Sequence, residues 1–287
     1  MSAPSLSRAK AAAGDLSVRD LGELLAALAL RTGVDLAGQR PAMLARRAAY
    51  RIAASGARTP ADYLELLLRG DDAEPWRLLD RLTIKVSRLF RNPETFATIG
   101  DHVLPELRRR LGTRPLRVWS AGCARGEEAY GLAMLCAESG GAWSVLGTDV
   151  DRVAVERARA GTYPRAEAGH VPDAIAARHL TSRGDSAVAV RPELARHVRF
   201  AAHDLASGIP PAESAFHLVA CRNVLIYYVA ARQAEILWTL VASLAPGGAL
   251  VLGETEWPTA SVERRLRVLD RAHRIFELAA GAAEGSA

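Results

Sequence analysis

The chain has 287 residues, of which 49% are hydrophobic and 24% are charged, with a formal net charge of +5. This length suits one large domain or two modest ones, and the apolar fraction allows a sizeable core. No apolar run is long enough to cross a membrane, and the three cysteines lack the clustered partners of a zinc site. We therefore expect a cytoplasmic protein without a metal or a secretion signal.

The first part of the chain predicts a small helical domain. Residues 1–15 read as a flexible tail, and residues 16–82 show apolar residues at helical spacing with no strand signal. Thr59 before Pro60 is typical of a helix start. The helix from about Pro41 to Ala54 carries three arginines and no acid: Arg46, Arg47 and Arg51. They form either a solvated face or a docking face for an acidic partner, and the sequence leaves both open.

Residues 83–113 predict a linker and a further helix. Phe90-Arg91-Asn92-Pro93 reads as a turn into a helix that begins at Pro93, extends to Arg110 and is ended by Gly112.

From 114 to 280, strands and helices alternate, as in a doubly wound, Rossmann-like α/β domain. Strands are expected at Leu116–Ser120, Trp143–Thr148, Val198–Ala202, Phe216–Cys221 and Ala249–Gly253. Residues 162–197 do not fit this alternation. They predict an inserted β-subdomain with a hairpin turn at Arg183-Gly184-Asp185-Ser186.

The loop after the first of these strands carries the main functional signal. Ala121 and Gly122 follow the strand, and Glu127 and Glu128 open the next helix. A strand, a glycine loop and a helix bring backbone close to a nucleotide. Two carboxylates at the helix start would repel a pyrophosphate, but they suit an ammonium and a sulfonium. The pattern favours S-adenosylmethionine over NAD or ATP.

Polar residues follow the other strands at the same edge of the expected sheet. Asp149 closes the second strand, where a ribose would lie. Asp204-Leu205 follows the third strand and Arg222-Asn223 follows the fourth. Tyr227 is consistent with either a cleft or a core position.

Together these residues resemble the CheR-type family of chemotaxis-receptor glutamate O-methyltransferases. The resemblance runs from about Leu21 to Leu278 and is carried by five stretches: Leu89-Phe90-Arg91, Val118–Cys123 with Gly126–Glu128, Thr148-Asp149 with Asp151, Cys221–Tyr227, and Pro246–Gly248 with Gly253.

The resemblance implies a helical N-terminal domain, a methyltransferase domain and a role for each matched residue. Glu128 would lie at the amino-acid end of S-adenosylmethionine and Asp149 at its ribose, while Arg91 and Tyr227 flank the methyl group and the incoming carboxylate. The implied cofactor-binding set is Lys85, Ser87, Arg91, Ala121, Gly122, Glu128, Asp149, Asp204, Leu205, Arg222 and Asn223. The implied product is S-adenosylhomocysteine.

The implied partner is the cytoplasmic helical bundle of a chemoreceptor, docked by Arg46, Arg47 and Arg51. The short hairpin turn at 183–186 predicts no binding of a receptor C-terminal pentapeptide tether. We expect a monomer that does not enter a membrane. We also expect no binding of nucleic acid, since no aromatic base-stacking motif accompanies the basic charge.

Three residues depart from the family pattern. Lys85 stands where a neutral asparagine is usual, Arg125 replaces a small residue, and Ala129 replaces a proline. A cation beside a sulfonium should lower cofactor affinity. These departures leave an alternative open, in which the chain is a weakly active or inactive binding and scaffold protein.

Overall fold

A computed structural model describes residues 16–83, 87–213 and 215–279. The predicted tail at 1–15 and Lys85 therefore lie outside the described residues. The described residues divide into two compact units, one containing residues 16–83 with 227–232 and one containing residues 87–213 and 215–226 with 233–279. Each unit is described by itself. Within the described residues, no helix is long and apolar enough to cross a membrane.

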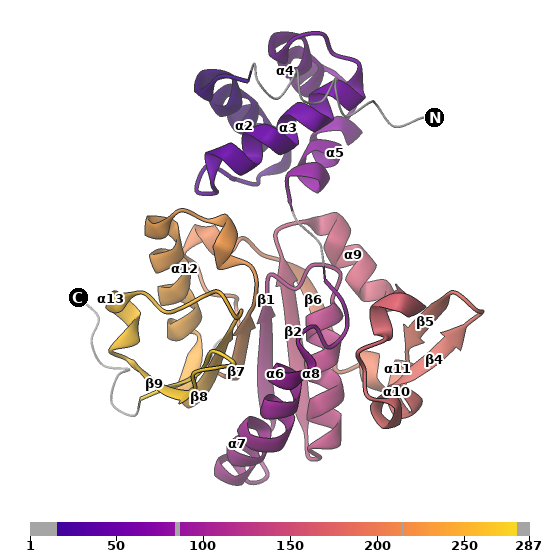
Figure 1. Ribbon diagram of the computed structural model, residues 1–287, viewed down its shortest axis with the longest axis vertical. Helices are drawn as coiled ribbons and strands as arrows, with labels where there is room; N and C mark the ends of the chain where they lie inside the picture. The colour runs from indigo at the N-terminus through magenta and orange to yellow at the C-terminus, as the bar shows by residue number, and fades with distance from the viewer. Residues whose placement is uncertain (1–15, 84–86, 214, 280–287) are drawn as a thin grey trace. The chain divides into compact units, whose positions relative to one another are not determined.

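Among its described residues, the smaller unit has four helices: α2 Val18–Thr32, α3 Pro41–Ser55, α4 Pro60–Arg69 and α5 Ala73–Leu82 (Figure 1). Ser17 and Thr59 each cap a helix start through a reciprocal pair of hydrogen bonds with an aspartate three residues later. The predicted helix start at Thr59-Pro60 is thus confirmed. Leucines from all four helices fill the core, among them Leu24, Leu28, Leu44, Leu67 and Leu78.

A short segment from far along the sequence completes this unit, which the sequence did not predict. The Arg40 amide donates to the Tyr227 carbonyl at 2.8 Å, and the Val229 amide donates to the Gly38 carbonyl at 3.1 Å. A Cβ atom at Gly38 would lie 2.8 Å from Nε of Arg232, so a glycine permits this close approach.

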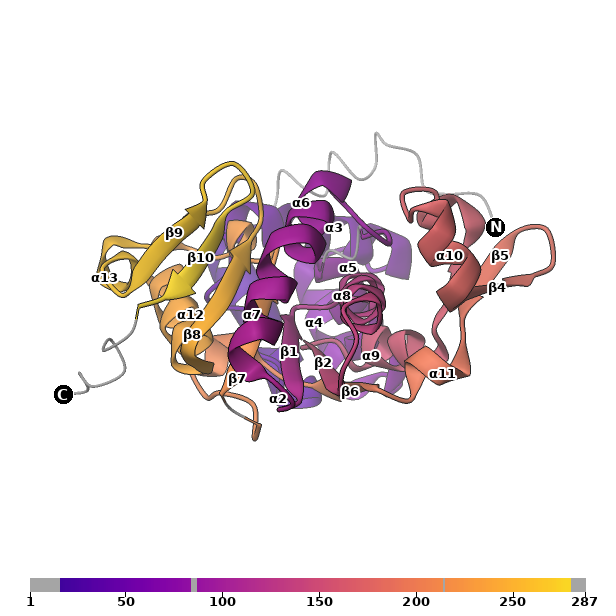
Figure 2. The ribbon, with the colours of Figure 1, turned by 90° about the horizontal axis from the view of Figure 1, so that it is seen from below.

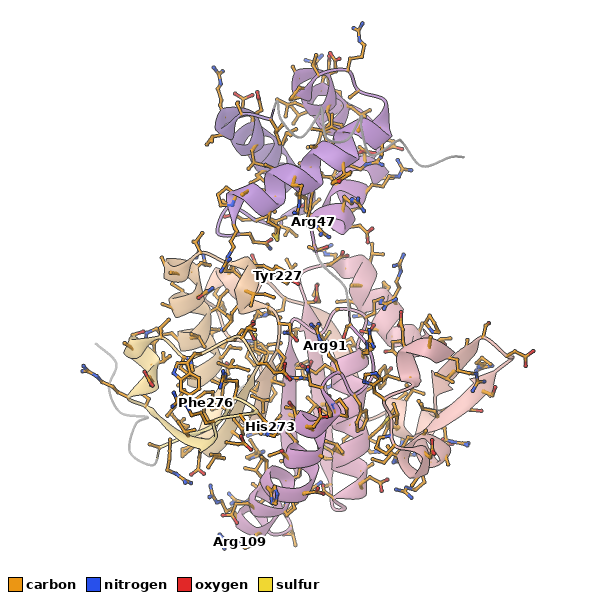
Figure 3. All side chains as sticks on the ribbon, viewed as in Figure 1. Arg47, Arg91, Arg109, Tyr227, His273 and Phe276 are labelled. Atoms are coloured by element: carbon orange, nitrogen blue, oxygen red, sulfur yellow. The ribbon has the colours of Figure 1, made fainter. Side chains whose placement is uncertain are left out.

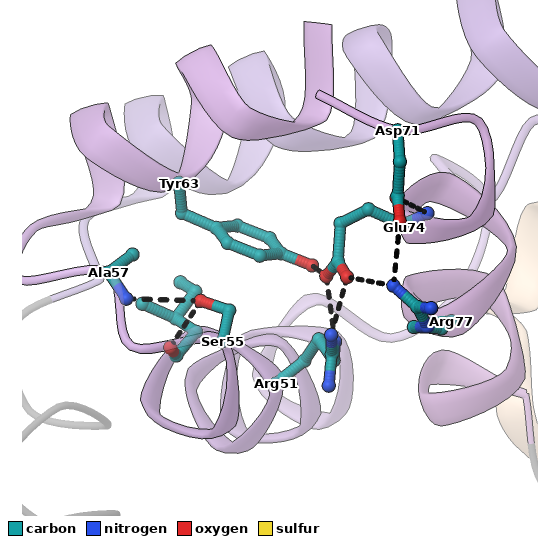
Figure 4. Close-up of polar contacts among 8 residues, drawn as sticks. Arg51, Ser55, Ala57, Tyr63, Asp71, Glu74 and Arg77 are labelled. Carbon is teal, nitrogen blue, oxygen red and sulfur yellow. Dashed lines mark hydrogen bonds and ion pairs between the residues drawn. The ribbon is translucent and has the colours of Figure 1, made fainter. Parts of the chain in front are cut away.

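Inside the smaller unit, a buried carboxylate joins three elements (Figure 4). Glu74 is 3% exposed and accepts hydrogen bonds from Arg51 Nε at 2.7 Å and from the Tyr63 hydroxyl at 2.7 Å. The Tyr63 side chain is fully buried. Burial alone would raise the pKa of Glu74, but the bonds from Arg51 and Tyr63 lower it overall.

The larger unit is organised around a seven-stranded sheet in the order β6-β2-β1-β7-β8-β10-β9. The pairs β1–β2, β1–β7, β2–β6 and β7–β8 are parallel, whereas β10 is antiparallel to both β8 and β9. The strands are β1 Leu116–Ala121, β2 Trp143–Asp149, β6 Val198–Ala202, β7 Phe216–Cys221, β8 Leu244–Leu252, β9 Leu266–Asp270 and β10 Ile275–Leu278. The predicted doubly wound sheet is confirmed, although β9 and β10 were not predicted.

Helices cover this sheet and share its core. The principal ones are α6 Pro93–Thr98, the π-helix η1 Ile99–Val103, α7 Leu104–Leu111, α8 Glu127–Glu138, α9 Arg152–Ala160, α12 Ala230–Ala242 and α13 Ala260–Glu263. Residues from α6, η1, α7 and α8 join β1 in one buried apolar cluster, and these helices run along the same side of the strands (Figure 2). Gly112, with φ +60°, follows the end of α7 as predicted.

The part of the chain between α9 and β6 forms a second, smaller sheet. It contains β3 Thr162–Pro164, β4 Leu180–Arg183 and β5 Ala187–Val190, antiparallel in the order β3-β5-β4. The short helices η2 Arg165–Ala168, α10 Asp173–His179 and α11 Pro192–Ala195 accompany it. Arg183 pairs with Ala187 across the turn, which confirms the predicted hairpin.

Candidate functional site

The loop after β1 is held against the ends of two neighbouring strands. The amides of Gly122 and Cys123 both donate to the Thr148 carbonyl at 2.8 Å. Gly122 has φ +76°, and a Cβ atom there would lie 2.6 Å from Cγ2 of Val224. A glycine is needed at this position because its left-handed backbone conformation disfavours other residues, and because the Val224 side chain leaves no room for a Cβ atom.

Asp149, at the end of β2, fixes the same loop through its carboxylate. It accepts the Ala124 amide on Oδ2 at 2.8 Å and the Asp151 amide on Oδ1 at 3.0 Å. Its own carbonyl accepts the His203 amide at 2.9 Å. Asp149 therefore joins the loops that follow β1, β2 and β6.

Glu128 lies in the first turn of α8 with its side chain 13% exposed. Ser120 Oγ donates to Glu128 Oε1 at 2.8 Å, and Oε2 lies 3.7 Å from Arg222 NH1. Burial raises the pKa of Glu128, while the charge of Arg222 and the bond from Ser120 act in the opposite direction. The positive charge of Arg91 also acts on this carboxylate.

Arg222, directly after β7, is the buried centre of the site. Its side chain is 3% exposed, and NH2 donates to the Arg91 carbonyl at 2.9 Å and to Asn92 Oδ1 at 2.8 Å. The guanidinium carbon lies 5.4 Å from the centre of the Phe96 ring. Burial lowers the pKa of Arg222. Arg222 thus joins the segment that carries Arg91 (Figure 3) to the carboxyl end of the sheet.

The loop after Arg222 is held by a carboxylate that the sequence analysis missed. Glu256 is 4% exposed and accepts the amides of Asn223 and Val224, each at 2.9 Å. An acid after the last parallel strand was the available signal, but the Asn223 and Val224 amides that it binds lie 33 and 32 residues away in the sequence.

Asp204 and Leu205 complete this edge of the sheet after β6. Asp204 Oδ1 accepts the Ala206 amide at 2.8 Å and begins the 3₁₀ turn η3 Leu205–Ser207. Leu205 is buried.

Eight of the predicted cofactor residues therefore lie at or shortly after the carboxyl ends of the parallel strands or in the first turn of the adjoining helix: Ala121, Gly122, Glu128, Asp149, Asp204, Leu205, Arg222 and Asn223. Arg91 joins them through Arg222. Ser87 is half-buried in the segment before α6. Tyr227 belongs to the smaller unit, where its carbonyl accepts the Arg40 amide, and Lys85 is outside the described residues. Their roles stay predictions.

Arg125, the unusual cation in the glycine loop, is paired within the larger unit. Its NH2 lies 2.8 Å from Glu127 Oε1 and donates to Glu167 Oε2 at 2.9 Å. Tyr163 donates its hydroxyl to the Arg125 carbonyl at 2.8 Å. Two carboxylates therefore compensate the charge that Arg125 adds.

The three arginines of the predicted docking face differ in their surroundings. Arg51 binds the buried Glu74, and Arg47 donates to the carbonyls of Arg81 and Thr83 at 2.8 and 3.1 Å. Burial lowers the pKa of Arg47. Arg46 is exposed. Arg47 and Arg51 therefore connect α3 to α5 and to the residue that follows it, whereas Arg46 makes no such connection among the described residues, and the docking role of all three stays a prediction.

The chemistry of the site fits a ligand that carries both positive charge and hydroxyl groups. The carboxylates of Glu128, in the first turn of α8, and of Asp149, at the end of β2, supply acceptors, and the glycine loop at Gly122 lies between β1 and α8. Arg222 Nε is buried without a hydrogen-bond partner among the described residues.

Residues 19–83 match the family described as "CheR methyltransferase, all-alpha domain", and residues 85–274 match "CheR methyltransferase, SAM binding domain". The chain belongs to the CheR methyltransferase family. Its cofactor is S-adenosylmethionine, and the CheR fold assignment agrees with the helical unit and the mostly parallel sheet.

The chain is also similar in sequence to individual known proteins. The chain is 33% identical to a "Chemotaxis protein methyltransferase" of Escherichia coli, over 79% of this chain and 80% of the relative. It is 32% identical to "Chemotaxis protein methyltransferase 1" of Pseudomonas aeruginosa, over 62% and 68% of the two chains. It is also 35% identical to an uncharacterized 104.1 kDa protein of Rhodobacter capsulatus, and that match covers 90% of this chain but 27% of the larger protein.

Proposed function

We propose that this CheR methyltransferase transfers the methyl group of S-adenosylmethionine to glutamate side chains of chemoreceptors, giving glutamate methyl esters. The network that joins Glu128, Arg222 and the Arg91 segment at the carboxyl edge of the sheet is the observation that carries the proposal. The names of the relatives support the link to chemotaxis.

The residues of the site have distinct tasks in this proposal. Glu128 and Asp149 would hold the positively charged end and the ribose of the cofactor, and Asp204, Leu205 and Asn223 would line its other side. When bound, the cofactor supplies a methyl group that its sulfonium activates toward a carboxylate oxygen. The chain's own contribution is to hold, orient and desolvate the reacting groups.

The accepting carboxylate needs orientation rather than activation. A glutamate side chain has a pKa of about 4.3 and is already ionised at neutral pH, so no general base is required. Orientation of this kind can supply several kcal/mol. A guanidinium such as that of Arg91 can hold a carboxylate by two parallel hydrogen bonds. Tyr227 is the second candidate for this task, as a neutral donor.

The decisive experiment is methyl transfer from labelled S-adenosylmethionine to the cytoplasmic fragment of a chemoreceptor. Activity should appear as base-labile methyl esters, because esters release methanol in alkali whereas methylated amines do not. A receptor fragment with glutamine in place of the accepting glutamates is the control. Cofactor binding without transfer to any receptor fragment would instead support the non-catalytic alternative.

Arg125 no longer favours that alternative, because its charge is paired with Glu127 and Glu167.

For the partner, we propose that the acidic receptor bundle docks through Arg46. We also propose that the chain binds no receptor C-terminal pentapeptide. Calorimetry with a receptor-tail pentapeptide should show no binding. Tight binding would contradict the expectation drawn from the short hairpin turn at 183–186.

A further inference from the structure

The turn that follows β8 carries a carboxylate that binds backbone instead of side chains. Glu256 Oε2 accepts the amides of Gly253 at 2.7 Å and Asn223 at 2.9 Å. Glu256 Oε1 accepts the amides of Val224 at 2.9 Å and Ile226 at 3.3 Å. One buried side chain thereby receives four backbone donors, three of them from the loop after β7.

These bonds compensate the burial of the carboxylate and fix the loop at the same time. An ionised carboxyl is an acceptor at both oxygens, so it can satisfy donors on two sides. Asn223 adopts φ +60°, a conformation that is uncommon for a residue other than glycine and needs support from its surroundings. A Cβ atom at Gly253 would lie 2.6 Å from Glu256 Oε2, so the turn is shaped around this carboxylate.

The same turn also supports the other side of the site. Glu254 Oε1 accepts the Asn92 side-chain amide at 2.6 Å, and Asn92 Oδ1 accepts from Arg222 NH2 at 2.8 Å. The turn 253–256 is therefore connected both to the Asn223 loop and, through Asn92, to the buried guanidinium of Arg222.

We propose that Glu256 is a positioning residue for cofactor binding, which sets the conformation of the Asn223–Ile226 loop through its backbone hydrogen bonds. This inference rests on the proposed function, because it assigns Asn223 to the S-adenosylmethionine site. Glu256 does not touch the reacting groups in this role. It holds the loop whose residues do the binding.

The test compares Glu256→Gln with Glu263→Gln, using titration calorimetry with S-adenosylhomocysteine. A glutamine at 256 offers one acceptor oxygen and turns an NH2 group toward amide donors, so affinity should fall at least about tenfold. Glu263 is exposed in α13 and accepts from Trp257 Nε1 at 3.2 Å, so its variant makes the same chemical change nearby without reaching the loop. Its affinity should stay within about twofold of the parental chain.

Several results would overturn the positioning role. One is parental affinity in a folded Glu256→Gln chain, and another is an equal loss in Glu263→Gln. If Glu256→Gln does not fold, Glu256→Asp is measured in its place: it keeps the charge but retracts it, and the proposal expects a partial loss of affinity. Failure of both variants to fold would identify Glu256 as a purely structural residue and reject the proposal.

Two further readouts separate this inference from the proposed function. The apparent KM for a receptor fragment should stay unchanged in Glu256→Gln, because the loop is assigned to the cofactor, and a raised receptor KM at parental cofactor affinity would count against the inference. If the parental chain binds S-adenosylhomocysteine but methylates no receptor, the proposed function fails while the positioning role stands.

Discussion

Replacing Arg51 by alanine should destabilise the helical unit rather than only weaken docking of a partner. Arg51 makes two hydrogen bonds to Glu74, whose side chain is 4% exposed. Removing the arginine would leave a buried carboxylate with Tyr63 and the more distant Arg77 as its remaining donors. Breaking a buried ion pair by removing one partner costs about 3–5 kcal/mol.

The lower end of that range applies here. Arg51 is itself 20% exposed, so its desolvation is incomplete, and Arg77 NH1 still lies 3.5 Å from Glu74 Oε2. We expect a loss of about 3 kcal/mol, which is a large fraction of the stability of a typical domain. The loss should depend on pH, because the native pKa of Glu74 is lowered below that of the unfolded chain. The contribution is full above the unfolded value of about 4.3 and disappears as the pH falls through the native pKa.

The assay is urea unfolding of the full-length chain followed by far-ultraviolet circular dichroism, at neutral pH and again below pH 4. Arg46→Ala is the matched control from the same helix, since Arg46 is exposed. It should change the free energy of unfolding by less than about 0.5 kcal/mol while raising the apparent KM for a receptor fragment. An Arg51→Ala chain as stable as the parent would refute the structural reasoning, and an unchanged KM for Arg46→Ala would refute docking through Arg46.

Three further predictions concern the larger unit. Glu128→Gln removes the charge beside Arg222, so calorimetry should show at least about tenfold weaker cofactor binding; equal affinity would contradict its role. Gly122→Ala places a methyl group 2.6 Å from Val224 in a left-handed conformation, so urea unfolding should show a loss of about 1–3 kcal/mol, and a neutral effect would show that the loop yields easily. Burial lowers the pKa of His217 to about 4, so the unfolded chain takes up a proton before the native chain does. Stability should therefore decline as the pH falls from about 6.5 toward 4, and this part of the decline should be absent in His217→Gln.

The sequence predicted those parts of the site that depend on local pattern. A strand followed by a glycine loop placed Gly122, and the end of the next strand placed Asp149, because parallel strands deliver their following loops to one edge of the sheet. The structure confirms the sheet and the positions of these residues. Their chemical roles follow from the family resemblance and await the binding measurements.

Other features depend on contacts that no local pattern contains. Glu256 binds backbone amides, which every residue except proline possesses, so no partner residue type identifies it. Arg51 occupies a helix position that spacing alone assigns equally well to solvent or to the interior. The contact of the Tyr227 segment with Arg40 and Gly38 joins positions nearly two hundred residues apart. In each case the deciding partner lies far away in the sequence.

A departure from a family pattern has to be judged by the partners of the new side chain, and Arg125 illustrates why. Considered alone, a cation in the glycine loop should repel a sulfonium. The structure places its guanidinium between Glu127 in α8 and Glu167 in η2, so the three side chains carry a net charge of about −1 when ionised. The substitution therefore adds a connection between the cofactor loop and the small sheet rather than an uncompensated charge. The electrostatic objection to cofactor binding then reduces to Lys85 alone, and the replacement Lys85→Asn tests it directly.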